Sequence, residues 1–244
     1  DWGTLIELLN EDYFDLIAKK QLSVEKAATN LIDRIEQAGE KVGIGKRLQG
    51  LDQTTMQTIV DTINDEAIDM VKEKMENYPD TLEGKTIVIE FARGGAQGSD
   101  MPLIAPFGYQ YSIGKLCDEL LQDASILYIW VTPEESRRKN EARTDPNDPG
   151  SILHHGVPIH VMLNDYGCCD MDWLEENSQK DGTITIKKED KAYHLPIGRF
   201  DNRVDKTSFI RENPKDWKPE DVKTVRDGLS GALNKSYQWR QKNL

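Results

Sequence analysis

The chain has 244 residues, of which 37% are hydrophobic and 30% charged, a balance typical of a globular protein whose core needs no disulfides. Its formal net charge of −12 argues against a protein that mainly binds DNA or RNA, and against binding to an anionic membrane surface, because both need a basic footprint. A small phosphorylated ligand remains compatible with this charge, since it needs only a local basic cluster.

Targeting and redox signals are sparse. No apolar run approaches the roughly 20 residues of a membrane span, and no signal peptide is visible. The three cysteines, Cys117, Cys168 and Cys169, are odd in number and two are adjacent, which makes a poor disulfide framework. We therefore expect a reducing compartment, the cytoplasm.

The first 82 residues are expected to form a helical segment. Apolar side chains recur at helical spacing from Leu5 to Ile17. Ser23 is expected to cap a second helix that ends near Gly39. A third helix should begin near Thr54 and stop before Pro79.

The pattern changes at Gly84. The run Thr86–Phe91 is apolar, rich in β-branched residues and typical of a central parallel strand buried on both faces. A glycine-rich loop follows at residues 94–100, and then a short helix is expected over residues 112–122. The run from Ile126 to Val131 predicts a second buried strand.

The clearest local signal begins at Thr132, which precedes Pro133 and stands three residues before Glu135. This spacing is a capping box with proline in the first helical turn, and it predicts a helix over residues 132–145. Further along, we expect a helix over residues 154–176 with a break at Gly167. A β-hairpin is expected from strands at 183–187 and 193–197, and a last helix at about residues 219–242.

Strands that alternate with helices predict an α/β fold: a three-layer αβα sandwich with a mainly parallel sheet and a late β-hairpin. Residues 1–82 would pack on the sheet of a core formed by residues 83–244, so that the whole chain is one domain. Ligands of such sheets bind outside the carboxyl ends of the strands. Residues 90–95, 132–143 and 199–206 should therefore converge on one site.

The stretch from Ile126 to Arg143 resembles the lid region of P-loop kinases of the deoxynucleoside and thymidylate kinase type. In that family a buried strand and a polar turn lead into a helix that begins with Pro-Glu and carries spaced arginines, as Pro133 and Glu134 begin this one. The family's lid arginines stabilise the charge on the transferred phosphoryl group. The resemblance thus implies ATP phosphate binding by Arg137, Arg138 and Arg143. Alternatively, these arginines form a solvated helix face, on which Arg137 pairs with Glu141 four residues on. Because Arg137 has this local partner, Arg138 and Arg143 are the stronger candidates for phosphate binding.

Two further segments extend the resemblance. The run Thr86–Phe91 looks like the family's third strand, which ends in an acid followed closely by arginine, although here two residues separate Glu90 from Arg93. By this likeness Glu90 would orient the acceptor or bind Mg²⁺, and Arg93 would hold the acceptor; a structural ion pair is the other reading. The segment ending at Asn202 looks like the last strand and nucleotide-base loop. Asn202 would then contact the base, or close an Asx-turn.

The family's phosphate-binding loop, Gly-x-x-x-x-Gly-Lys-Ser/Thr, does not occur in this sequence. The closest stretch, residues 43–46, lacks both the spacing and a preceding strand. We expect the loop and its strand to lie upstream of Asp1.

A zinc site is the least favoured hypothesis. Its candidate ligands lack the usual spacing, so helix residues and partly buried thiols are the better interpretation; they are His154, His155, His160, Cys168 and Cys169.

The resemblance implies a phosphotransferase that moves the γ-phosphoryl group of Mg-ATP to a hydroxyl or phosphate acceptor such as a nucleoside, a nucleotide or another metabolite. Two alternatives remain open: a binding or regulatory module that has lost catalysis, and a nucleotide hydrolase. The expected partner is a small-molecule substrate, without nucleic acid or membrane, and a homodimer stays open.

Overall fold

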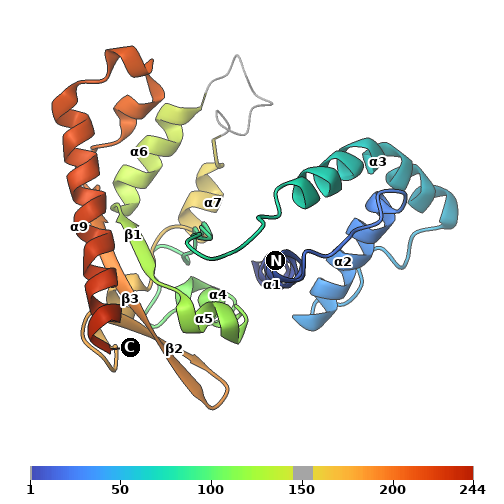
Figure 1. Ribbon diagram of the computed structural model, residues 1–244, viewed down its shortest axis with the longest axis horizontal. Helices are drawn as coiled ribbons and strands as arrows, with labels where there is room; N and C mark the ends of the chain where they lie inside the picture. The colour runs from blue at the N-terminus through green and yellow to red at the C-terminus, as the bar shows by residue number, and fades with distance from the viewer. Residues whose placement is uncertain (1, 145–155, 244) are drawn as a thin grey trace. The chain divides into compact units, whose positions relative to one another are not determined.

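The computed structural model describes residues 2–144 and 156–243, which form two compact units (Figure 1). The first unit contains the residues up to Phe91 together with Lys115–Cys117. The second contains Ala92–Gly114 and the residues from Asp118 onward.

Three helices make up most of the first unit, as the sequence predicts: α1 (Trp2–Ala18), α2 (Ala27–Lys41) and α3 (Gln53–Glu76). Helix α2 packs against both of the others, with Ala27, Ala28 and Ala67 at the centre of the α2–α3 contact. The expected cap of α2 is wrong, because the helix begins only at Ala27, after a turn, and Ser23 lies outside it.

The predicted strand over residues 86–91 is wrong. Thr86–Phe91 has no regular secondary structure, and Val88 is 87% exposed. A strand exists only where its backbone N–H and C=O groups pair with a neighbour. Here the apolar run has the composition of a strand but no ladder partner among the residues that the structure describes.

The second unit is built on a sheet of three strands, β1 (Ile126–Trp130), β2 (Thr183–Lys188) and β3 (Lys191–Asp201), in the order β1-β3-β2. Strand β1 runs parallel to β3, whereas β2 and β3 form the expected antiparallel hairpin. The three-layer sandwich with a mainly parallel sheet is therefore wrong for the described part of the chain, whose sheet is small and mixed. The reason is that only one of the two expected central strands finds a partner.

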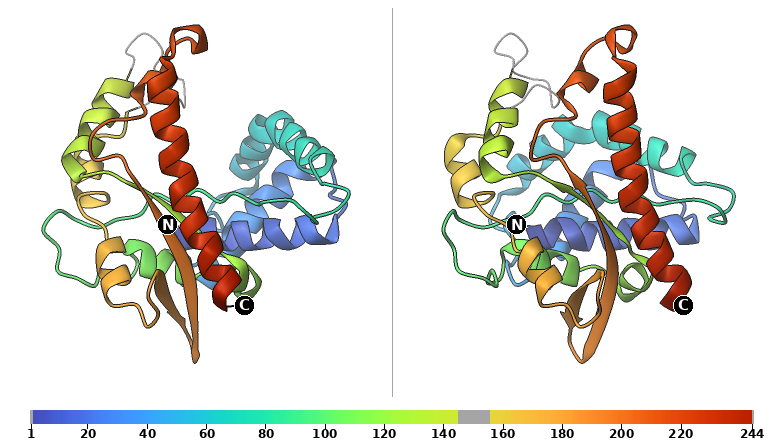
Figure 2. Two further views of the ribbon diagram at one scale, coloured as in Figure 1. Left: turned by 60° about the vertical axis from the view of Figure 1, so that its left-hand side comes forward. Right: turned by 90° about the vertical axis from the view of Figure 1, so that its left-hand side faces the viewer.

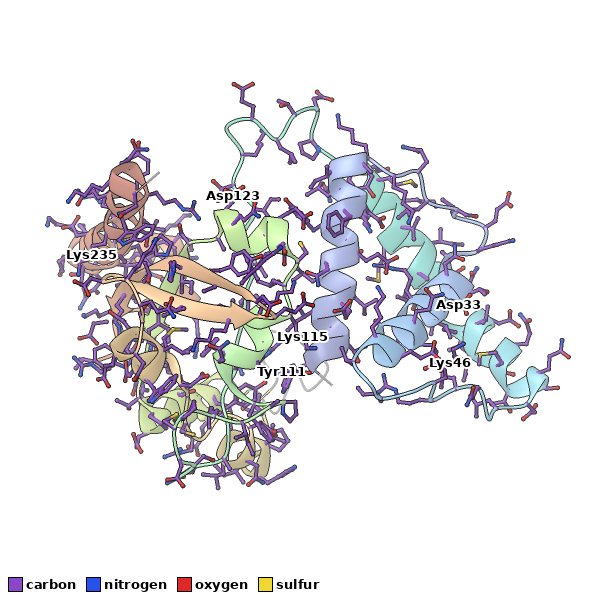
Figure 3. All side chains as sticks on the ribbon, turned by 90° about the horizontal axis from the view of Figure 1, so that it is seen from below. Asp33, Lys46, Tyr111, Lys115, Asp123 and Lys235 are labelled. Atoms are coloured by element: carbon purple, nitrogen blue, oxygen red, sulfur yellow. The ribbon has the colours of Figure 1, made fainter. Side chains whose placement is uncertain are left out.

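Six α-helices and two 3-10 turns accompany this sheet in the described part of the second unit. Two α-helices replace the one expected over residues 112–122, and the expected break at Gly167 separates two more. The elements are α4 (Gly108–Gly114), α5 (Asp118–Asp123), α6 (Pro133–Arg143), α7 (Ile159–Asn164), α8 (Met171–Glu176), the 3-10 turns η1 (Ser208–Arg211) and η2 (Pro214–Asp216), and α9 (Pro219–Asn243). Figure 3 labels Tyr111 on α4 and Asp123 at the end of α5.

Helix α9 lies along β3 and is the main cover of one face of the sheet (Figure 2). The approach is very close, because Gly198 of β3 faces the backbone of Ala232, and Gly228 of α9 faces the ring of Phe200. The opposite face packs on α4 and α8, with Ile184, Ile186, Leu195, Met171 and Leu174 almost fully buried. None of the described helices is long and apolar enough to cross a membrane.

The hairpin is fastened to α5 by an ion cluster that should make its stability depend on pH. Asp118 at the start of α5 accepts hydrogen bonds from Lys191 and Lys188, which hold the pKa of this carboxyl well below its usual range. The charged carboxylate of Asp118 therefore stabilises the folded protein fully at pH values above the ordinary pKa of aspartate, about 4. This stabilisation is lost as the pH falls from there towards the lower pKa of the folded state. We expect Asp118→Asn to be less stable than the parent at pH 7, with the difference shrinking below about pH 4. Urea unfolding at pH 7, 4 and 2.5 measures this. A difference independent of pH would contradict the ionic origin.

Candidate functional site

The carboxyl ends of β1 and β3 meet at one edge of the sheet, because the two strands are parallel. Trp130, the last residue of β1, stands in register with Asp201, the last of β3. Helix α6 starts after Trp130, with only Val131 and Thr132 between them, and residues 202–207 continue from β3 (Figure 1). This carboxyl edge is where the sequence predicts ligand binding.

The start of α6 confirms the predicted cap. Thr132 has an extended backbone, and its Oγ1 accepts a hydrogen bond from the backbone N–H of Glu135 at 3.2 Å. Pro133 occupies the first turn, where no backbone N–H is needed. The cap fixes where the helix begins, and so it fixes which side chains of α6 point towards the loop after β3.

Two cations of α6 are bound to that loop. The guanidinium of Arg138 donates from Nε and Nη2 to the two carboxylate oxygens of Glu135, both at 2.7 Å, and Nη2 also reaches Asp205 at 3.2 Å. Lys139 donates to Asp205 at 3.1 Å and to the hydroxyl of Thr207 at 3.3 Å. The hydrogen bond from Arg138 lowers the pKa of Glu135 and raises that of Arg138 itself. The charges are therefore fixed, and the fork of Arg138 already holds one planar oxyanion.

The other two arginines of α6 have guanidinium nitrogens that are buried without a hydrogen-bond partner among the described residues: Nη1 of Arg137 and Nε of Arg143. Arg137 pairs with Glu134 at 3.3 Å and not with Glu141, the partner expected from the sequence. Arg143 donates from Nη2 to the side-chain oxygen of Asn140 at 3.1 Å. A buried cationic donor without an acceptor is costly, and an anionic ligand would relieve that cost.

Asn202 closes a turn. Its side chain is buried, its Oδ1 accepts from the backbone N–H of Lys206 at 2.9 Å, and its Nδ2 donates to Thr207 Oγ1 at 3.0 Å. Asp205 closes the next turn by accepting from the backbone N–H groups of Thr207 and Ser208, both at 3.1 Å. Burial opposes ionisation of Asp205, but hydrogen bonds from Ser208, Thr207 and Lys139 outweigh it and lower the pKa. Asn202 thus holds the loop through a hydrogen bond that spans four residues, whereas the Asx-turn of this loop, which spans two residues, is formed by Asp205.

Glu90 and Arg93 belong to different units. Glu90 is exposed in the irregular segment of the first unit. Arg93 is half-buried in the second unit, and burial lowers its pKa. It precedes Gly94 and Gly95, which pack against residues 165–168, where Gly95 and Cys168 form an antiparallel bridge.

The structure adds polar residues that the sequence did not single out. Asp170 is fully buried and accepts hydrogen bonds from the backbone N–H groups of Tyr109 and Gln110 at the start of α4. Burial raises the pKa of Tyr109 to about 12. Arg203 and Arg199 lie over the ring of Trp130. Only the three-dimensional contacts reveal these side chains. Asp170 and its donors are far apart in the sequence, and Arg203 lies in a loop that carries no recognisable motif.

No group of three or more metal-binding side chains gathers among residues 2–144 and 156–243. His154 and His155 lie outside the described residues. Cys168 donates to the carbonyl oxygen of Ala96 at 3.1 Å, whereas Cys169 Sγ lies 3.3 Å from the hydroxyl of Tyr128. The adjacent thiols thus have different neighbours and do not form a common site.

Comparison of this chain with protein-family models, with curated proteins and with solved structures found no match.

Proposed function

We propose that the carboxyl edge of β1 and β3 binds the phosphate groups of a small molecule, and that the chain transfers a phosphoryl group from Mg-ATP to a hydroxyl or phosphate acceptor. One observation carries the proposal. Helix α6, which directly follows a parallel strand, brings Arg138 and Lys139 to the loop after β3, and the preceding residue, Arg137, has a buried guanidinium nitrogen with no hydrogen-bond partner among the described residues.

The physical chemistry of phosphoryl transfer fits such a cluster. Negative charge spreads over the phosphate oxygens in the transition state, and guanidinium groups stabilise it through paired hydrogen bonds. The carboxylate of Glu135, held by two nitrogens of Arg138, occupies the place that two phosphate oxygens would take. Phosphate binding would release Arg138 from Glu135 and would give an acceptor to Nη1 of Arg137, which has none among the described residues. Magnesium would arrive on the phosphates of ATP, since Mg²⁺ is commonly held by substrate phosphates and one or two carboxylates.

Isothermal titration with Mg-ATP tests the binding step. We expect Arg138→Ala and Arg137→Ala each to weaken binding about tenfold, the loss of about one charge-assisted hydrogen bond. Arg226→Ala is the matched control, because Arg226 lies on α9, is exposed and carries the same charge. It should bind as the parent does.

Transfer of label from γ-labelled ATP to a panel of nucleosides, nucleotides and sugars tests the reaction. Label in an acceptor supports the transferase, whereas label only in inorganic phosphate, with or without acceptors, identifies a hydrolase. A folded protein that does not bind Mg-ATP, or equal affinities in all three variants, would remove the proposal.

A binding module is the second candidate, and a different observation favours it. Leu127 and Ile129 of β1 are 37% and 43% exposed, and Leu233 and Tyr237 of α9 are 53% and 62% exposed. By the strand register, Leu127 and Ile129 lie on the face that α9 covers. Exposed apolar side chains on one face are typical of contact surfaces for other proteins. This candidate takes precedence if no phosphate compound binds.

A further inference from the structure

Arg203 forms a flat cationic surface at the carboxyl edge. The central carbon of its guanidinium lies 3.7 Å from the centre of the Trp130 ring, which is stacking distance. Trp130 ends β1, and Arg203 stands two residues beyond the end of β3. Arg203 belongs to the segment 199–206 that is expected at the site, but its side chain has no role predicted from the sequence.

The guanidinium is held in its orientation from the side. Its Nε donates to Asp201 Oδ1 at 3.0 Å, its Nη2 donates to Oδ2 at 2.9 Å, and the backbone N–H of Arg203 also donates to Oδ1 at 3.1 Å. These hydrogen bonds lower the pKa of Asp201 and raise that of Arg203, so both groups stay charged. With its fork engaged and the indole beneath, Arg203 has little freedom left to lose when a ligand binds.

Its outer face remains available, since the side chain of Arg203 is 44% exposed. The charge is neutralised within the plane by Asp201, which makes Arg203 a poor clamp for a phosphate. A planar guanidinium stacks well on aromatic rings, and an immobilised one does so at low entropic cost. The exposed face thus suits a flat, uncharged part of a ligand.

The cations of α6 lie at the other end of the same loop. Lys139 bonds to Asp205 and Thr207, and Arg138 bonds to Asp205, while Arg203 is tied to Asp201 at the loop's start. We propose that Arg203, supported by Trp130, is a stacking platform for a planar aromatic ring of the ligand whose phosphates bind to α6. This inference rests on the proposed function and narrows its substrate class to phosphorylated compounds with an aromatic ring.

Two ligands with the same phosphate chain test the platform: Mg-ATP, which has a ring, and Mg-tripolyphosphate, which has none. Their affinities are measured by calorimetry for the parent, Arg203→Ala and Arg203→Lys. Stacking of one base contributes enough that we expect both variants to bind Mg-ATP about tenfold more weakly. Tripolyphosphate affinity should change less than about twofold, because the phosphates do not contact Arg203. Lysine keeps the charge and removes the plane, so it separates stacking from electrostatics.

Arg211→Lys makes the same conservative change at another exposed arginine and serves as the control. Circular dichroism checks that each variant is folded. Parent-like Mg-ATP affinity in Arg203→Lys would overturn the platform, since charge alone would then suffice. Equal weakening of both ligands would also overturn it, because Arg203 would then only shape the loop, while the proposed function would stand. If the parent binds neither ligand, the proposed function fails and the inference fails with it.

Discussion

Gly198→Ala should destabilise the second unit by about 3 kcal/mol, at the upper end of what overpacking a well-packed interface costs. A Cβ atom at this position would lie 1.9 Å from the carbonyl oxygen of Ala232 and 2.5 Å from its carbonyl carbon. Both atoms belong to the backbone of α9, which cannot rotate away as a side chain can. Helix α9 would therefore have to move off β3, and that shift would also separate Phe200 from Gly228.

Urea unfolding followed by tryptophan fluorescence measures this loss. The matched control is Gly231→Ala on the same helix, where an added Cβ would meet nothing within 4 Å. It should stabilise the protein by about 0.5–1 kcal/mol, since alanine loses less conformational freedom than glycine on entering a helix. Equal stability of Gly198→Ala and the parent would show that α9 does not approach β3 as closely as described.

Asp170→Ala should cost about 3 kcal/mol of stability, because it leaves two backbone donors buried without an acceptor. The carboxylate accepts from Tyr109 N at 2.7 Å and from Gln110 N at 3.1 Å, and the residue is completely buried. Gly108, at φ 80°, lies so close that a Cβ there would be 2.5 Å from Asp170 Oδ2. The carboxylate thus holds the start of α4 in place.

Asp52→Ala gives the comparison for Asp170, since the side chain of Asp52 also accepts a backbone N–H at a helix start, that of Thr55 in α3, but at the surface. Water can accept the hydrogen bond in place of the exposed Asp52 side chain, so Asp52→Ala should cost much less stability than Asp170→Ala. Thermal or urea unfolding measures both variants, and hydrogen exchange at the amides of Tyr109 and Gln110 should accelerate only in Asp170→Ala. Similar costs for the two substitutions would mean that burial of Asp170 does not matter.

Arg138 shows how far the site could be predicted. The sequence correctly placed it on a helix that begins at Pro133, because the cap depends on residues three positions apart. It did not reveal the ion pair with Asp205, which lies 67 residues away. Arg203 on Trp130 is a similar case, since neither residue belongs to a motif and their contact arises from the register of β1 and β3.

The sequence by itself determined the three helices of the first unit, strand β1, the start of α6, the β2–β3 hairpin and α9. These elements follow from local signals: apolar periodicity, caps, and strands joined by a short turn. Only the tertiary structure decided that Thr86–Phe91 is not a strand and that the sheet is small and mixed. It also decided that Asp170 is a buried cap. The physical reason is that these features depend on distant parts of the chain. A strand needs a neighbouring strand to pair with, and a buried carboxylate needs donors, and the residues at one position do not specify either partner.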